Sequence, residues 1–341
     1  MKENFGAKVN FDVNAFKTDL DLSAFNHVLV ITGTQNSLRA FETKVRPVLE
    51  AKKVNFKVFT NISANLTEHE VYSVVNYVKG DEIDCILSVG ADAVMDCGRL
   101  VSLLLSHGGF LHDYLPGGSV GPAGITEKVI HHKTVPTMPA AGSEISNQST
   151  VRIGGQSVII ASPFLIPDEA FVDPKLMTDM PGDLWAIRGF DGFATALGAY
   201  VSEKANEFSD TYALPALQSY IGHARYLVKD PNNLGNIRHA CVVSMNAFLA
   251  ASYSGTGLYC IIANSLVSRL GIRRGVAQAL ICPQTSAHLY EKNPARFDEV
   301  AKMLGGKDIK DAITKLVKSL GIQLPDTIFG DKDVKAVLRG T

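Results

Sequence analysis

The chain of 341 residues is long for one domain and comfortable for two. Its charge is nearly balanced, with 33 Lys and Arg against 34 Asp and Glu and no basic block, which argues against nucleic acid or an anionic lipid surface as its partner. The five cysteines are scattered and show no CxxC spacing. This usage is typical of a reduced protein, so we expect a cytoplasmic location.

The sequence also argues against a membrane protein. Its first residues contain no apolar core that would make a signal peptide. The longest apolar stretch, residues 240–270, is interrupted by Asn246, by residues 254–257 and by Asn264. We therefore predict two helices buried in a large core rather than a helix that spans a bilayer.

Strand and helix patterns alternate in the first half of the chain. The predicted strands are residues 27–33, 56–60 and 85–90, and the predicted helices between them are residues 38–51 and 67–79. The second helix opens on Thr67 followed by Glu70, a capping-box pattern. Strands separated by helices of this length predict a parallel sheet with right-handed crossovers.

The second half of the chain is helical. Residues 151–155 and 157–161 predict a β-hairpin over a Gly-rich turn, and strand patterns then cease near residue 174. Helical periodicity follows in residues 184–205, 210–228, 234–254, 259–269, 295–304 and 308–320. We predict an α/β domain over residues 1–165 and an all-α domain over residues 166–341, with ligands bound in the cleft between them.

Five segments give the chain a resemblance to a known family. They are residues 88–99, 136–144, 166–176, 189–200 and 271–283. In order and spacing they resemble the iron-containing (group III) alcohol dehydrogenases. The resemblance implies a Rossmann-like dinucleotide-binding domain followed by a helical domain, the architecture shared with dehydroquinate synthase. It also implies NAD(P)-dependent chemistry on a small alcohol or carbonyl substrate, and a homodimer.

The family's metal ligands are largely replaced in this chain. The resemblance places Asp191 at the one acidic ligand position, and Thr195, Cys260 and Arg274 at the three histidine positions. Asn264 stands where the family has a further histidine that is not a ligand. Because one position holds a permanent cation, we expect no metal at these vacated positions.

Arg274 offers a replacement for the metal's charge. Its guanidinium is suited to stabilise a developing alkoxide or to clamp a substrate carboxylate, with Thr195 hydrogen-bonded to the same oxygen. Without an ion between them, Asp191 and Arg274 are expected to pair. Two interpretations stay open: a salt bridge that only closes the old site, or an arginine that still reaches substrate.

Residues 88–99 resemble the family's glycine-rich loop, which binds a pyrophosphate through backbone amides. Gly90 is retained, whereas Ala91, Asp92 and Ala93 replace the residues that follow. The Asp92 carboxylate either opposes a phosphate or turns outward to cap a helix that begins near Ala93. Ser157 is the nearest match to the family's hairpin lysine.

Other cofactor positions survive. Asn65, Thr137 and Met138 lie in segments that resemble the family's dinucleotide contacts. The loop after the first strand has no acidic residue, which resembles the NADP-preferring pattern. Its expected contacts are Gly33, Asn36, Ser37 and Arg39. Arg39 either meets the 2′-phosphate or is a solvated helix residue.

Two functions follow as hypotheses. The first is an NAD(P)-dependent, metal-independent alcohol dehydrogenase or carbonyl reductase, with NADP favoured over NAD. The second is an inactive homologue that serves as a ligand-binding or partner subunit. The histidines show no metal-like spacing, and residues 131–133 are expected in a solvated loop.

Overall fold

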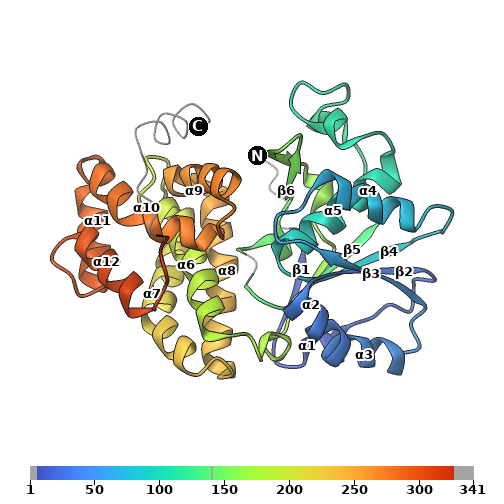
Figure 1. Cartoon of the computed structure of the whole chain (residues 1–341), viewed down its shortest axis with the longest axis horizontal. Coiled ribbons are helices and arrows are strands. Elements are labelled where there is room, and N and C mark those ends of the chain that lie inside the picture. The colour runs from blue at the N-terminus through green and yellow to red at the C-terminus, as the bar shows by residue number, and fades with distance from the viewer. Residues whose placement is uncertain (1–5, 140, 326–341) are drawn as a thin grey trace. The chain divides into compact units, whose positions relative to one another are not determined.

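The computed structural model describes residues 6–139 and 141–325 of the chain. It divides into two compact units, Met1–Met177 and Thr178–Thr341 (Figure 1). The division lies after the predicted boundary at 165/166, because residues 169–172 form a strand of the first unit's sheet.

The first unit is built on a six-stranded parallel sheet. Its strands are β1 (Lys8–Phe11), β2 (Val28–Gly33), β3 (Phe56–Ile62), β4 (Cys85–Gly90), β5 (His131–Pro136) and β8 (Glu169–Val172). The order across the sheet is β1-β8-β5-β4-β2-β3. The parallel sheet is thus confirmed, whereas β1, β5 and β8 were not among the three predicted strands.

Helices cover both faces of this sheet (Figure 1). They are α1 (Ala15–Asp19), α2 (Gln35–Ala40), α3 (Arg46–Ala51), α4 (Glu68–Tyr77) and α5 (Asp92–His107). A π-helical turn, Phe41–Val45, joins α2 to α3. The predicted capping box is present in α4, where the Glu70 amide donates to Thr67 Oγ1 over 3.3 Å and the Thr67 amide donates to the Glu70 carboxylate over 2.8 Å.

Alternation along β2 explains the two-faced packing. Val28 and Val30 pack in the cluster that contains Phe41 of the α2–α3 segment, whereas Leu29 and Ile31 pack with α4 and α5. Because successive strand residues point to opposite faces, one continuous apolar run fills both cores.

The chain reverses direction across the sheet between β2 and β4. Strand β2 pairs with β3 on one side and with β4 on the other. Helix α2 leaves β2 toward one face, and α5 leaves β4 toward the opposite face (Figure 1). Such a switch point is where open α/β sheets bind their ligands.

The expectation for residues 131–133 is wrong. They begin β5, which lies between β4 and β8, so His132 and Lys133 are 2% and 8% exposed. Only His131 is exposed. The predicted hairpin is confirmed as β6 (Gln148–Ile153) and β7 (Gln156–Ala161), with Gly154 and Gly155 at positive φ in the turn.

The second unit is all-helical. Its helices are α6 (Gly182–Tyr200), α7 (Glu207–Lys229), α8 (Leu234–Ser254), α9 (Gly257–Leu270), α10 (Arg274–Leu289), α11 (Pro294–Met303) and α12 (Ile309–Ser319). Helix α10, which contains Pro283, was not among the predicted helices. In the described part of the chain, no helix combines the length and apolar character needed to cross a bilayer.

Candidate active site

Asp191 and Arg274 meet as an ion pair inside the helical unit. Arg274 Nε lies 2.9 and 3.0 Å from the two Asp191 carboxylate oxygens, and Nη2 lies 2.7 Å from Oδ2. The Asp191 side chain is 4% exposed and that of Arg274 is 33% exposed. Two nitrogens of the guanidinium therefore donate to the carboxylate as a two-nitrogen fork, and this bidentate geometry gives the strongest hydrogen bonding between the two groups.

Close helix packing brings the two residues together. Arg274 is the first residue of α10, and Asp191 lies in α6. At Gly275 an added Cβ would lie 2.0 Å from the carbonyl oxygen of Ile187, which stands one turn before Asp191. Only glycine permits this approach, so Gly275 sets the reach of Arg274 to Asp191.

Hydrogen bonds also link Thr195 and Cys260, which the family resemblance matches to two further ligand positions. Thr195 Oγ1 donates to the Asp191 carbonyl over 2.9 Å and lies 3.5 Å from Cys260 Sγ. Because the Thr195 proton is already used, the thiol is the donor in that second contact. Gln278 Nε2 donates to the same sulfur over 3.6 Å. The three helices α6, α9 and α10 are thereby joined through polar side chains.

Sequence reasoning missed Gln278, which is fully buried. It lies one turn after Arg274, so a prediction of α10 would have placed it on the same face. Its Oε1 atom has no hydrogen-bond partner among the described residues.

Cys260 is held as a neutral thiol. Burial raises the pKa of the thiol, although the positive charge of Arg274 acts in the opposite direction. Within residues 6–139 and 141–325 no group of three or more His, Cys, Asp or Glu side chains is placed to hold a metal. Asn264 lies half-buried on α9, one turn after Cys260.

Gly33 and Gly90, two of the residues expected to contact the dinucleotide, lie at the switch point between β2 and β4. Gly33 ends β2 and Gly90 ends β4. An added Cβ at Gly90 would lie 2.6 Å from Val94 and 3.3 Å from the hydroxyl of Ser37. Thr137 follows β5 there; its amide donates to the Gly90 carbonyl over 3.0 Å, and its hydroxyl lies 3.5 Å from that of Ser37.

Helix α5 begins one residue earlier than expected. Ala91 is the N-cap and provides no side-chain cap, and Asp92 is the first helical residue. The prediction that Asp92 caps a helix beginning near Ala93 is therefore wrong. Its carboxylate lies in the first turn, where the helix dipole favours negative charge.

The other predicted cofactor residues are placed as follows. Arg39 is exposed on α2, with Nη2 3.4 Å from Asn36 Oδ1. Asn65 is exposed after β3, and Met138 is 6% exposed beside Thr137. The structure thus brings Gly33, Ser37, Gly90 and Thr137 into contact, whereas it records no contact of Asn65 with that group.

A buried ion pair lies within α5, the helix that follows Gly90. Arg99 of α5 is fully buried and pairs with Asp96, one turn earlier. Burial raises the pKa of Asp96 to about 6, although the charge of Arg99 opposes the shift. Sequence reasoning matched both residues to a family segment but assigned them no role.

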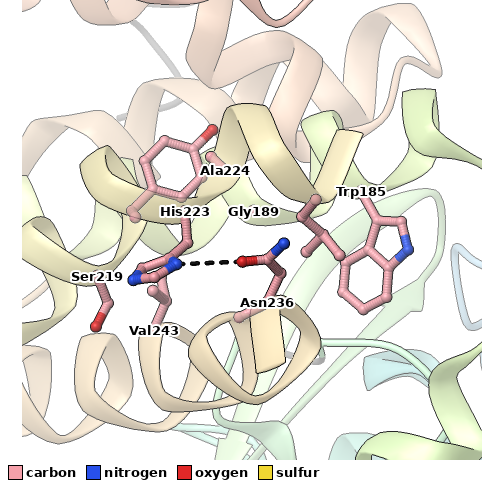
Figure 2. Close-up of a pocket in the computed structure, with 10 residues that line it drawn as sticks. Trp185, Gly189, Ser219, His223, Ala224, Asn236 and Val243 are labelled. Atoms are coloured by element: carbon pink, nitrogen blue, oxygen red, sulfur yellow. Dashed lines mark hydrogen bonds between the residues drawn. The ribbon is translucent and has the colours of Figure 1, made fainter. Parts of the chain in front are cut away.

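A small cavity lies elsewhere in the helical unit, among α6, α7 and α8 (Figure 2). It measures about 20 Å³ and is lined by side chains that include Trp185, His223 and Asn236. His223 Nδ1 lies 3.2 Å from Asn236 Oδ1 (Figure 2). A space of this size holds about one water molecule and no predicted site residue lines it, so it is not a substrate pocket.

Two family models match the sequence. The model "Iron-containing alcohol dehydrogenase" matches residues 7–174, and the model of the family's C-terminal part matches residues 185–335. Long-chain-alcohol dehydrogenase 1 of Geobacillus thermodenitrificans is 25% identical over 283 residues, 82% of this chain and 70% of the relative. The NAD-dependent methanol dehydrogenase of Bacillus methanolicus is 20% identical over 279 residues, 81% of this chain and 72% of the relative.

The fold is shared with solved structures. The iron-containing alcohol dehydrogenase of Thermotoga maritima superimposes with a TM-score of 0.85 at 21% identity, over 98% of this chain and 90% of that one. Both family models follow one another along the chain in the order of the two structural units. The chain therefore belongs to the iron-containing alcohol dehydrogenase family.

Proposed function

We propose that this chain is an NAD(P)-dependent oxidoreductase of the alcohol dehydrogenase or carbonyl reductase type that works without a metal ion. The observation that carries the proposal is the guanidinium of Arg274 on the carboxylate of Asp191. A fixed positive charge then occupies the position at which the family resemblance places a metal ligand.

The residues at the ligand positions do not fit a divalent cation. The Asp191 carboxylate is taken by Arg274, and Arg274 remains protonated at any working pH. Cys260 is a buried thiol rather than a thiolate, and the thiolate is the form that binds metals. We expect no stoichiometric iron or zinc in protein purified after metal-supplemented expression. One tightly bound ion per chain in elemental analysis would contradict this proposal.

The switch point of the first unit fits a dinucleotide. No side chain caps the N-terminus of α5, where backbone amides and the helix dipole favour an anion, and Gly90 lets Val94 and Ser37 pack closely at the end of β4. Thr137 and Ser37 add hydroxyl groups at the same place. When bound there, a reduced nicotinamide supplies the hydride for carbonyl reduction.

Arg274 has two tasks in this proposal. Its Nε and Nη2 atoms hold Asp191, and its charge stabilises negative charge that develops on a substrate oxygen. Because Arg274 is the first residue of α10, the positive end of that helix dipole adds to the charge of its guanidinium. Thr195 donates to the Asp191 carbonyl, so it serves a substrate oxygen only if that bond is exchanged.

Two measurements test the proposal. Titration with NADPH and NADH, followed by the fluorescence of the reduced nicotinamide, is expected to show binding of both and tighter binding of NADPH. No acidic side chain is present among Gly33, Asn36 and Ser37 to repel the 2′-phosphate, and Arg39 lies exposed beside them. Equal or reversed affinities would contradict the NADP preference.

The second measurement concerns Arg274→Lys. A lysine keeps the charge but cannot form the two-nitrogen fork. If Arg274 acts on substrate, turnover or anion binding falls while the melting temperature changes little. Unchanged turnover in this variant would contradict the catalytic role of Arg274.

A second function is favoured by the same ion pair. Because the fork engages Arg274 with Asp191, the pair is also suited to closing an inactive site in a homologue that serves as a ligand-binding or partner subunit. Failure of both NADPH and NADH to bind would support that function. For either function we expect a homodimer, as the family resemblance implies.

A further inference from the structure

Arg99 is a fully buried guanidinium that contacts two other segments of the first unit and Asp96 of its own helix. Its Nε donates to Ser149 Oγ over 3.0 Å, at the start of β6. Its Nη1 donates to the Ser143 carbonyl over 2.7 Å, and Nη2 donates to Ser143 Oγ over 2.6 Å and to Asp96. A buried charge is tolerated only with such partners, so these contacts are tightly constrained.

Ser143 lies at the centre of this network. Its hydroxyl is 3.2 Å from Asp96 Oδ1 and 3.5 Å from the carbonyl oxygen of Asp92, in the first turn of α5. Asp96 Oδ2 in turn accepts from the Thr150 amide over 3.1 Å. Ser143 is thus tied to α5, and Thr137 is tied to Gly90.

We propose that Arg99 is a positioning residue that fixes the segment carrying Thr137 and Ser143 against the first turn of α5, and that this fixed arrangement determines how tightly the chain holds a dinucleotide. The inference rests on the proposed NAD(P)-dependent function. It adds that affinity depends on a side chain that does not itself touch the cofactor.

The chemistry of arginine explains why a lysine does not serve here. The guanidinium directs five N–H groups in a plane, and three of its nitrogens face acceptors in different directions. An ammonium group directs its three donors from one atom. In Arg99→Lys the chain keeps its buried charge and its pairing with Asp96, but loses contact with Ser143 or Ser149.

The first experiment titrates the full-length wild type, Arg99→Lys and Arg46→Lys with NADPH. Arg46 is a surface arginine paired with Glu42, and it serves as the matched control. We expect NADPH affinity about tenfold weaker in Arg99→Lys, equivalent to about 1.4 kcal/mol, and unchanged in Arg46→Lys. Far-UV circular dichroism checks that each variant is folded.

The second experiment removes one hydroxyl from the network. Ser143→Ala loses the contacts of Oγ with Arg99, Asp96 and Asp92 but keeps the backbone carbonyl that Arg99 Nη1 uses. Ser146→Ala is the control, because the Ser146 hydroxyl bonds only to the backbone of Gln148 among the contacts recorded. We expect weaker NADPH binding in the first variant only. In the double variant that combines Ser143→Ala with Arg99→Lys, the loss of NADPH affinity is expected to be smaller than the sum of the two single losses, because both changes break the same network.

The pH profile separates positioning from a merely structural role. NADH affinity is expected to fall as pH drops through about 6 in the wild type, because Asp96 then takes up a proton and its charge pairing with Arg99 ends. NADH is the probe here because its pyrophosphate does not titrate in this range. The other charged groups that act on the pair are Asp92 and Glu144. In Arg99→Lys the midpoint of the fall in NADH affinity is expected to shift to higher pH, because lysine stabilises the Asp96 carboxylate less than arginine does.

The outcomes are distinguishable. If the wild type binds neither NADPH nor NADH, the proposed function fails. If the wild type binds but folded Arg99→Lys and Ser143→Ala bind equally well with an unchanged pH midpoint, the positioning role of Arg99 is wrong. Hydrogen exchange of amides 141–150 in the cofactor-free variants gives an independent readout, and faster exchange than in the wild type is expected.

Discussion

At the scale of single residues, the Asp191–Arg274 pair shows how a buried carboxylate is balanced by a cation. Asp191 is 3% exposed, and an unpaired carboxylate at such burial is strongly unfavourable. Arg274 supplies both the opposite charge and three close N–O contacts. Asp191 therefore depends on Arg274 for the balance of its charge.

This interpretation predicts a non-additive mutant pair. Arg274→Leu is expected to lower the free energy of unfolding by about 2–3 kcal/mol, because it leaves the Asp191 carboxylate buried alone; the partial exposure of Arg274 keeps the loss below that of a fully buried pair. Asp191→Leu with Arg274→Leu is expected to recover most of that loss. Urea unfolding followed by the fluorescence of Trp185, the chain's single tryptophan, measures these two variants and Asp191→Leu. Additive losses in the double variant would show that the two side chains do not depend on each other.

At the scale of helices, the approach of α10 to α6 decides whether the site exists. Gly275 lets the start of α10 reach the carbonyl of Ile187, and Arg274 is thereby set beside Asp191. The same helices are joined further along through Thr195, Cys260 and Gln278. The spacing of helix axes, rather than any single side chain, therefore controls the charge pairing.

Gly275→Ala is expected to be destabilising by about 1–3 kcal/mol, because the new methyl group overlaps the Ile187 carbonyl and one helix must move. Gly222→Ala is the matched control. Gly222 lies within α7 with no atom within 4 Å of an added Cβ, so the greater helix propensity of alanine is expected to stabilise the protein by about 0.5–1 kcal/mol. Urea midpoints of the two variants give the comparison, and equal effects of the same sign would contradict it.

At the scale of the whole molecule, one buried histidine makes stability depend on pH. His132 Nε2 lies 2.9 Å from Ser88 Oγ, and Gly98 of α5 packs directly on both side chains. Burial, followed by the charge of Arg99, lowers the pKa of His132 from 6.5 to about 3. The folded unit therefore holds this ring neutral under conditions in which the unfolded chain protonates it.

The sign of the effect follows from that difference. The stabilisation is fully present above pH 6.5 and is lost as pH falls toward 3, because the unfolded state then binds one more proton. Between pH 6 and 5 we expect the free energy of unfolding to fall by about 1.2 kcal/mol from this group alone. Urea unfolding followed by circular dichroism at pH 7, 6 and 5 measures the slope. His132→Gln cannot titrate, so its free energy of unfolding is expected to fall less between pH 7 and 5 than that of the wild type, and an equal change in both proteins would contradict the assignment.

The sequence by itself determined the class of the fold. Apolar runs that alternate with helical periodicity require a parallel sheet covered on both faces, and the later helices follow from their own periodicity. Local chemistry also fixed the Thr67–Glu70 capping box and the hairpin turn at Gly154 and Gly155. Each of these features depends on neighbours a few residues apart, and such neighbours are visible in sequence.

Only the tertiary structure decided which distant residues meet. The burial of His132 depends on β5 lying between β4 and β8, which its own local pattern does not reveal. Helix α10 was not predicted, so the position of Gln278 beside Cys260 was not predicted either. The network of Arg99 joins residues that lie 44 and 50 positions apart in the chain. Pairings of this kind follow from strand order and helix packing, which sequence periodicity leaves open.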